Sequence, residues 1–193
     1  MNSNENAMPS LWRGKLIHLR ALEPTDWETY FSWNFDDEQT RPLYFVPPPT
    51  SREAVRRWAE QQSTRPISDD NIRCAIARLD DDAVVGNIDT HDADPRVGTF
   101  SYGINVKRGE QRKGYAREAV LLLLRYYFQE RRYQKATVTI YSFNEASKRL
   151  HESLSFQLEG RVRRMVYTDG SYHDHLIYGL TVEEFREKHL ASM

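Results

Sequence analysis

The chain has 193 residues, 39% of them hydrophobic, which is enough for one soluble domain with a sizeable core. Its 27 basic residues nearly balance its 28 acidic ones, so no overall charge points to nucleic acid or a lipid surface as the main partner. No apolar run approaches the roughly 20 residues that a membrane-spanning helix needs. We therefore expect no nucleic-acid partner, no membrane partner, and only a local site for any anion.

The N-terminal segment and the cysteine content bear on domain organisation and compartment. Residues 1–10 contain no apolar signal-peptide core, so we expect a disordered tail followed by a single domain over residues 11–193. The one cysteine, Cys74, cannot form an intramolecular disulfide and lies in an alternating, strand-like run. We interpret Cys74 as a small buried residue of a cytoplasmic protein.

In the first half of the chain, the spacing of apolar residues predicts a strand at 15–22, a helix at 24–35, a helix after 50, and strands at 71–79, 83–91 and 97–106. Thr25 or Asp26 is the expected cap of the first helix, and Thr50 or Ser51 that of the second. Short polar turns between the three strands predict antiparallel pairing.

In the second half, the pattern predicts a long, largely buried helix at 116–128, a strand at 135–143, a helix at 144–154 and a closing hairpin of 161–168 with 171–181. The pair Asp169-Gly170 is a strong hairpin signal. Together the two halves indicate a mixed sheet with helices packed on it.

The loop before the long helix reads Gln111, Arg112, Lys113, Gly114, Tyr115 and Ala116. The first amides of a helix lack internal partners and carry a partial positive charge, so they bind anions such as pyrophosphate. Gly114 lets an anion approach the backbone, while Arg112, Lys113 and Arg117 add cationic donors. Nucleotide-binding P-loop and dinucleotide motifs are absent. From the residues alone, a pyrophosphate site and a solvated basic helix start both stay open.

This loop resembles the Gln/Arg-x-x-Gly-x-Gly/Ala motif with which the GNAT superfamily of N-acetyltransferases holds the pyrophosphate of acetyl-coenzyme A. The segment 143–160 is similar to the family's Asn-x-x-Ser/Ala-x-x-x-Tyr-x-x-x-Gly-Phe helix and following strand. Residues 16–33 resemble the opening of the branch that includes the Rim-type enzymes, which acetylate the N-termini of ribosomal proteins. The resemblance extends over about residues 15–182.

The resemblance implies a GNAT-like α/β (α+β) fold: a twisted, mostly antiparallel mixed sheet with helices on both faces, splayed at its centre around acetyl-coenzyme A. It also implies a bulge near the end of the strand at 97–106, where a backbone amide faces the thioester carbonyl. The implied cofactor contacts are Ile104, Asn105, Val106, Gln111, Arg112, Lys113, Gly114, Tyr115, Ala116, Asn144 and Ser147. As an asparagine, Asn144 is also a good helix cap.

For catalysis, the resemblance points to His151, which occupies the position where the family usually has the tyrosine that protonates the leaving thiolate. A histidine with a pKa near ~6.5 can supply that proton. Ser147, one helical turn earlier, is the alternative, and a packing role for His151 also stays open. Ser155 replaces the family's glycine, which puts the local turn geometry in question.

The general base and the acceptor are less defined by the sequence. Candidate proton acceptors, each of which is equally readable as a solvated residue, are Asp89, His91, Asp92 and Asp174. His173 and His175 share a strand face but lack a nearby third ligand, so we expect no metal.

We therefore expect an enzyme that transfers the acetyl group of acetyl-coenzyme A to a primary amine, either a peptide N-terminus or a small molecule, by direct attack in a ternary complex. The alternative is a non-catalytic acyl-coenzyme A binding module. A homodimer and a monomer both stay open.

Overall fold

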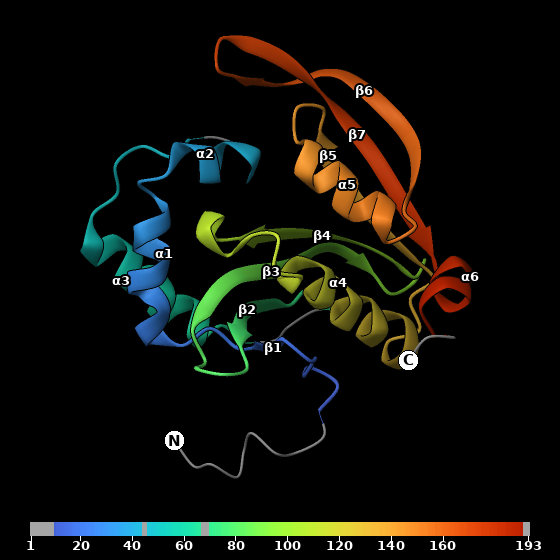
Figure 1. Ribbon diagram of the computed structural model, residues 1–193, viewed down its shortest axis with the longest axis horizontal. Coiled ribbons are helices and arrows are strands. Elements are labelled where there is room, and N and C mark those ends of the chain that lie inside the picture. Colours follow the sequence, from blue (N-terminus) through green and yellow to red (C-terminus); the bar gives the residue numbers. More distant parts are fainter. Residues whose placement is uncertain (1–9, 44–45, 67–69, 191–193) are drawn as a thin grey trace.

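A computed structural model describes residues 10–43, 46–66 and 70–190. Its seven strands form one sheet in the order β1-β2-β3-β4-β5-β7-β6 (Figure 1). The strands are β1 Ile17–Arg20, β2 Arg73–Arg78, β3 Val84–Asp94, β4 Thr99–Val106, β5 Lys135–Tyr141, β6 Gln157–Thr168 and β7 Ser171–Thr181. Within this sheet β4 and β5 pair in parallel, and the other neighbours pair antiparallel. This is the mostly antiparallel mixed sheet that the sequence predicts.

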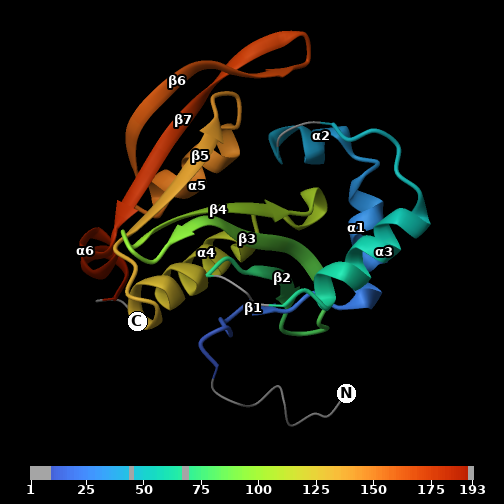
Figure 2. The same ribbon diagram turned by 180° about the vertical axis from the view of Figure 1, so that it is seen from behind.

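Helices of different lengths connect the strands. The α-helices are α1 Trp27–Trp33, α2 Asp37–Thr40, α3 Arg52–Ser63, α4 Tyr115–Arg125, α5 Glu145–Ser153 and α6 Val182–Phe185. Shorter or wider helical turns are η2 Pro24–Asp26, η3 Arg41–Leu43, η4 Arg108–Glu110, η5 Tyr126–Glu130 and η6 Arg186–Leu190. The view from behind shows the hairpin of β6 and β7 reaching past the end of β5 (Figure 2).

Every element predicted from the sequence is present, and the differences lie at ends and caps. Ser51 caps α3, because its Oγ accepts a hydrogen bond from the Ala54 amide at 3.2 Å. Asp26 stands at the N-cap of α1, but its carboxylate pairs with Arg20 and accepts from the Glu23 amide instead. The sequence pattern gave no signal for α2 or α6. Of the expected tail over residues 1–10, residues 1–9 lie outside the described part of the chain.

Side chains of β3 show that helices cover both faces of the sheet. Thr90 points towards η5, the continuation of α4, where its Oγ1 lies 2.8 Å from the Tyr127 hydroxyl. Asn87, on the other face, lines a cavity together with Tyr30 of α1 and Trp58 of α3. The predicted covering of both faces is therefore confirmed. Cys74 is half-buried in β2, where burial raises the pKa of its thiol to about 12 and keeps it protonated.

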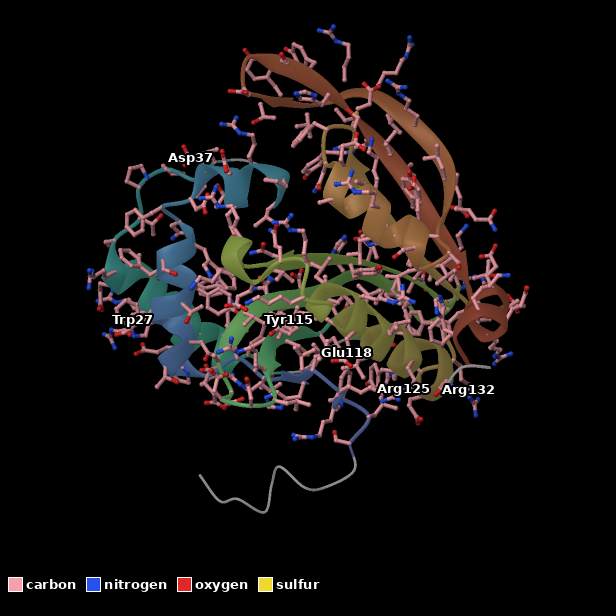
Figure 3. All side chains as sticks on the ribbon, viewed as in Figure 1. Trp27, Asp37, Tyr115, Glu118, Arg125 and Arg132 are labelled. Carbon is pink, nitrogen blue, oxygen red and sulfur yellow. The ribbon has the colours of Figure 1, made fainter. Side chains whose placement is uncertain are left out.

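Glu118, in the first turn of α4, ties the helix to the segment that enters β1; Figure 3 labels its side chain. Its carboxylate accepts hydrogen bonds from the amides of Lys15 at 2.6 Å, Leu16 at 2.8 Å and Ile17 at 2.9 Å. Gly14 makes room for it, since a Cβ there would come within 2.3 Å of the Glu118 carboxyl carbon. This contact fixes where the helix begins, and with it the position of the loop before the helix.

Candidate active site

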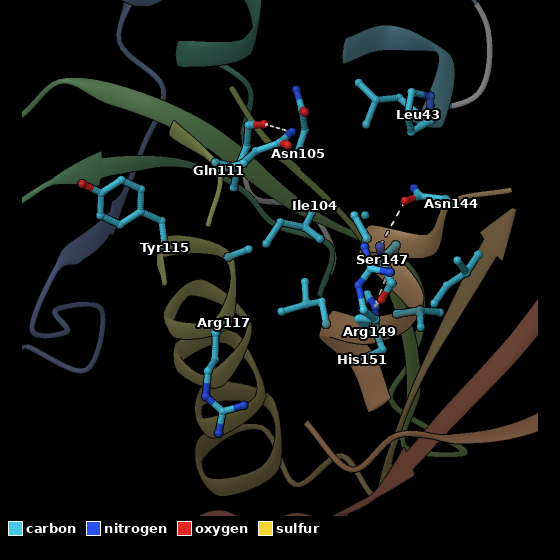
Figure 4. A pocket seen from close by; sticks show the side chains of 18 of the residues that line it. Leu43, Ile104, Asn105, Gln111, Tyr115, Arg117, Asn144, Ser147, Arg149 and His151 are labelled. Carbon is cyan, nitrogen blue, oxygen red and sulfur yellow. Dashed lines mark hydrogen bonds between the residues drawn. The ribbon is translucent and has the colours of Figure 1, made fainter. Parts of the chain in front are cut away.

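The cleft arises where β4 and β5 separate. The two strands pair only from Thr99 to Ser101 against Lys135 to Thr137 within the described sheet, and then diverge. The space between them is a cavity of about 640 Å³. It is bordered by the ends of β4 and β5, the loop before α4, the first turns of α5, and α2 with η3. In Figure 4, Ile104 lies between Tyr115 and Arg117 of α4 on one side and Ser147 and His151 of α5 on the other.

The free edge of β4 presents backbone groups to this cavity. The Lys107 amide bonds to the Val85 carbonyl at 2.8 Å, and hydrogen-bonded pairs alternate along an antiparallel ladder. The amide of Asn105 therefore points to β3, whereas those of Ile104 and Val106 point to the cleft. The expectation of a bulge here is wrong: pairing with β3 is continuous from Ser101 to Val106. The register shift lies instead between His91 and Asp94 of β3.

The loop of residues 111–116 turns with its amides free. Arg112 has φ 63° and Gly114 has φ 89°, left-handed conformations that a glycine adopts without a Cβ penalty. Within the described residues, no backbone hydrogen bond is donated by the amides of 112–117, and the first one in the helix comes from Glu118 to the Gly114 carbonyl at 3.1 Å. The Gln111 side chain anchors the loop by donating to the Val106 carbonyl at 3.1 Å. A row of unpaired amides thus stands at the start of α4, which is what a pyrophosphate requires.

On the opposite wall, Asn144 caps α5. Its Oδ1 accepts a hydrogen bond from the Ser147 amide at 3.0 Å, as the sequence predicts. Ser147 is half-buried and lines the cavity, one turn before His151. His151 is only 2% exposed, and its Nδ1 lies 2.8 Å from the Ser147 carbonyl and 3.3 Å from the Ser147 Oγ. Because a carbonyl only accepts, Nδ1 carries the hydrogen.

Similarity to known proteins agrees with this geometry. Residues 17–157 match the family model for the acetyltransferase (GNAT) domain. The chain belongs to the GNAT family of acetyltransferases. It is 40% identical over 178 residues to the prophage-derived, uncharacterized N-acetyltransferase YokL of Bacillus subtilis, covering 92% of this chain and 97% of YokL. It is 27% identical over 172 residues to YdaF of the same organism, provisionally named a ribosomal N-acetyltransferase, covering 88% and 93% of the two chains.

Solved structures show the same fold. A GNAT-family acetyltransferase from Bacillus anthracis superposes with a TM-score of 0.74 at 22% identity, covering 89% of this chain and 98% of that one. A spermidine N-acetyltransferase from Vibrio cholerae, solved with coenzyme A and spermine, superposes with a TM-score of 0.75 at 18% identity, covering 88% and 97%. The match to the family model and the 40% identity to YokL show that the protein is an acetyltransferase, and they give no support to a non-catalytic binding module.

In this GNAT chain, the cations near the loop are not equally available. Lys113 pairs with Glu110 at 2.8 Å, and Arg117 donates to the Ser153 carbonyl at 3.1 Å, which ties α4 to α5. Arg112 is exposed and forms no ion pair among the described residues. Arg112 is therefore the cation that meets an incoming anion at the smallest cost.

The protonation of His151 follows from its burial. Burial lowers the pKa of its imidazole, and the hydrogen bond to the Ser147 carbonyl opposes this shift only in part. The ring is therefore neutral at pH 7, with Nδ1 as donor and Nε2 as lone pair. Nε2 is buried without a hydrogen-bond partner in the described part of the chain, as is the nearby Tyr102 hydroxyl. The ring centroids of His151 and Tyr102 lie 5.7 Å apart.

Gln39 of α2 is one of the cleft residues that the sequence did not indicate. Its buried amide donates to the Asn105 Oδ1 at 2.8 Å and to the Val106 carbonyl at 3.3 Å, and accepts from the Arg108 amide at 2.6 Å. These bonds hold the end of β4 in place. A glutamine in a one-turn helix carries no sequence signal for such a contact.

The candidate proton acceptors lie in different settings. Asp174 is held by the Arg164 amide and Arg161, which lower the pKa of its carboxyl and make it a poor base. His91 and Asp92 are exposed on β3. Of these four residues, Asp89 is the one that lies within the sheet beside the cleft, in register with Gly103.

The structure gives no sign of a metal centre or a membrane span in the part of the chain that it describes. Within the described residues, no group of three or more side chains is arranged to hold a metal ion. No helix there is long and apolar enough to cross a membrane.

Proposed function

We propose that this enzyme transfers the acetyl group of acetyl-coenzyme A to a primary amine by direct attack while both substrates are bound. The observation that carries the proposal is the row of unpaired amides over residues 112–117, facing the free edge of β4 across one cavity. The amides at the helix start suit the pyrophosphate. The edge of β4 suits the amide groups of the pantetheine, which are spaced along an extended chain.

The reaction needs a donor for the thioester oxygen. The amides of Ile104 and Val106 point into the cleft, so either can donate to the oxyanion of the tetrahedral intermediate. The amine nitrogen then bonds to the thioester carbon, and the carbon–sulfur bond breaks. One proton leaves the nitrogen and one reaches the sulfur, which balances the reaction.

Ser147 and His151 are the groups that we assign to the sulfur. The Ser147 hydroxyl lies at the cavity wall, where it can donate a hydrogen bond to the leaving thiolate. His151 lies behind it with a lowered pKa, so its protonated form is scarce at neutral pH. A thiolate with a pKa near ~8.5 needs only modest assistance. We therefore assign the direct contact to Ser147 and a supporting position to His151.

The variant Gly114→Asp tests the cofactor site. It places a side chain and a negative charge against the pyrophosphate, in a left-handed conformation with φ 89° that aspartate tolerates better than most residues. We expect a folded protein that has lost acetyl-coenzyme A binding in calorimetry. Unchanged affinity in the folded variant would remove the loop from the proposal. Acetylation of a panel of peptides, polyamines and aminoglycosides by the unaltered enzyme then identifies the acceptor.

A further inference from the structure

A second cavity, also of about 640 Å³, lies beside the first on the face of the sheet that α1 and α3 cover. Its walls include the aromatic side chains of Tyr30, Trp33 and Trp58. Its floor is formed by strand residues Arg73, Asn87 and Asn105. Gln39 and Asn105 line both cavities, so the two spaces adjoin at the end of β4.

Asp89 lies on β3, between two strands whose residues line these spaces. It is in register with Arg73 on one side and with Gly103 on the other. Arg73 lines the second cavity and Gly103 the first. Because Gly103 has no side chain, the carboxylate stands next to an open position, with its Oδ1 3.9 Å from where a Cβ would be.

The carboxylate of Asp89 has few partners. Among the described residues it accepts one long hydrogen bond, from the Asn87 Nδ2 at 3.4 Å. Burial raises the pKa of this carboxyl, and the charges of Arg73 and His91 offset the rise only in part. A partly buried carboxylate with one weak partner is well suited to receive an ammonium group.

The charge of the second cavity restricts what else an acceptor can carry. Of its described lining residues, Arg73 is the only charged one. The guanidinium lies over the Trp58 ring at 5.9 Å and donates to the Gln62 Oε1 at 3.0 Å. A polyamine would place its second cation near this guanidinium, whereas a carbonyl or carboxylate would be attracted to it.

Two hydrogen-bond donors beside the cavity are unused. The Tyr30 hydroxyl and the Trp33 Nε1 are buried, and neither has a hydrogen-bond partner in the part of the chain that the structure describes. Buried polar groups in folded proteins nearly always have partners, so these two need an explanation. Carbonyl oxygens of a bound acceptor would supply the missing acceptors.

We propose that Asp89 holds the ammonium of the acceptor at the edge of the cofactor cleft, where this ammonium gives one proton to water to become the attacking amine, while the pocket of Tyr30, Trp33 and Trp58 receives the rest of the acceptor. The acceptor is a primary amine whose remainder is neutral or anionic and carries carbonyl groups, as in the N-terminus of a peptide, rather than a polycation. This inference rests on the proposed acetyl transfer to an amine.

The test compares Asp89→Asn with the unaltered enzyme. The probes are an equimolar set of Xaa-Ala-Ala tripeptides with free N-termini, and spermidine, each with acetyl-coenzyme A. We expect the unaltered enzyme to acetylate its best tripeptide with a kcat/KM at least tenfold above that for spermidine. Asp89→Asn is expected to lower the tripeptide value at least tenfold, with the dissociation constant of acetyl-coenzyme A within twofold. Asp80→Asn, which removes an exposed charge from the β2–β3 turn, is the matched control and keeps full activity.

Tyr30→Phe provides an independent test, because it removes only the unpaired hydroxyl. The variant is expected to raise the KM of the tripeptide three- to tenfold while leaving the melting temperature the same or higher. The inference is overturned if spermidine is the better substrate, if Asp89→Asn acetylates tripeptides normally, or if it weakens acetyl-coenzyme A binding and folding together. A protein that binds acetyl-coenzyme A but acetylates no amine would instead contradict the proposed function itself.

Discussion

The hydrogen bond between His151 and the Ser147 carbonyl decides how each side chain can assist the leaving thiolate. It occupies Nδ1 as a donor and leaves Nε2 buried, while burial lowers the pKa of the ring. A neutral imidazole in this tautomer has no proton directed at a sulfur in the cleft. The hydroxyl of Ser147 keeps its freedom to rotate and lines the cavity.

We therefore expect Ser147→Ala to lower kcat about ten- to a hundredfold, at or below the roughly hundredfold lower end of what a positioned proton donor contributes. His151→Phe should lower it less, and His151→Tyr should stay close to the unaltered enzyme. Acetyl-coenzyme A affinity, measured by calorimetry, should change little in all three, because the contact to sulfur strengthens only in the transition state.

The pH dependence of kcat separates the two assignments. If imidazolium were the acid, kcat would fall as the pH rises through a pKa below the ordinary ~6.5 of histidine. A hydroxyl donor predicts no such fall. If kcat of the unaltered enzyme falls as the pH rises, if this fall is absent in His151→Phe, and if Ser147→Ala has a nearly normal kcat, then His151 is the proton donor.

Ser155, which stands where the family usually has a glycine, adopts a backbone conformation that is unfavourable for a residue with a Cβ. It adopts φ 70° one residue past the C-cap of α5, a left-handed conformation that costs a residue with a Cβ about 1–2 kcal/mol. We expect Ser155→Gly to stabilise the fold by up to ~1 kcal/mol, because the relief of strain exceeds the roughly 0.5–1 kcal/mol of added unfolded-state entropy. Thermal unfolding should show a melting temperature about 2–4 °C higher. Ser153→Gly is the control, because Ser153 lies two residues earlier and is still helical, and this variant should have a lower melting temperature. If Ser155→Gly also has a lower melting temperature, the turn is not strained.

At the scale of elements, α4 combines the proposed anion site with an acidic residue in its own first turn. The negative charge of Glu118 would oppose a bound pyrophosphate if it were free. Its carboxylate instead accepts hydrogen bonds from three backbone amides, two just before β1 and one at its first residue. The contact pins the helix start and leaves the amides of 112–117 for the ligand.

Glu118→Gln should therefore destabilise the protein by about 2 kcal/mol, since hydrogen bonds to a charged group contribute roughly 1.5–3 kcal/mol each and water can replace part of them at this half-buried site. The melting temperature should fall by about 4–8 °C. Glu130→Gln, at the exposed end of the same helical segment, is the control and should change little. If both variants have the same melting temperature as the unaltered protein, Glu118 does not fix the helix start.

Elements with a strong periodic pattern could be predicted from the sequence, and contacts between distant segments could not. The buried stripe of α4, the alternation of β5 and the cap at Asn144 are local signals, and the structure contains all three. The three amides that meet Glu118 lie about a hundred residues away from it, and Gln39 reaches β4 from a one-turn helix. Neither contact leaves a trace in spacing or composition. The prediction of a bulge in β4 was wrong for a related reason: strand register depends on the partner strand, which the sequence of β4 does not contain.

At the scale of the whole molecule, the sheet consists of two parts joined over a short distance. Strands β1 to β4 form one part, and β5 to β7 the other, with three residues of parallel pairing between them. Across the mouth of the cleft, Arg41 of η3 donates to the Thr168 hydroxyl at 3.1 Å and lies 3.5 Å from the Asp169 carboxylate. The Tyr141 hydroxyl donates to the Leu43 carbonyl at 3.4 Å. A ligand in the cleft contacts both parts at once.

Coenzyme A should therefore stabilise the molecule as a whole. A ligand that binds only the folded state adds about 2.7 kcal/mol at a concentration one hundred times its dissociation constant. For a chain of this size that corresponds to a rise in melting temperature of roughly 5–10 °C. The rise should shrink as salt increases, because exposed Arg112 and the helix start attract the phosphates by charge. Gly114→Asp is the control and should show no rise at the same concentration. If the melting temperature of Gly114→Asp rises equally, or if the rise does not depend on salt, the ligand lies away from the start of α4. In that case pantetheine, which lacks the phosphates, should stabilise the protein as well as coenzyme A does.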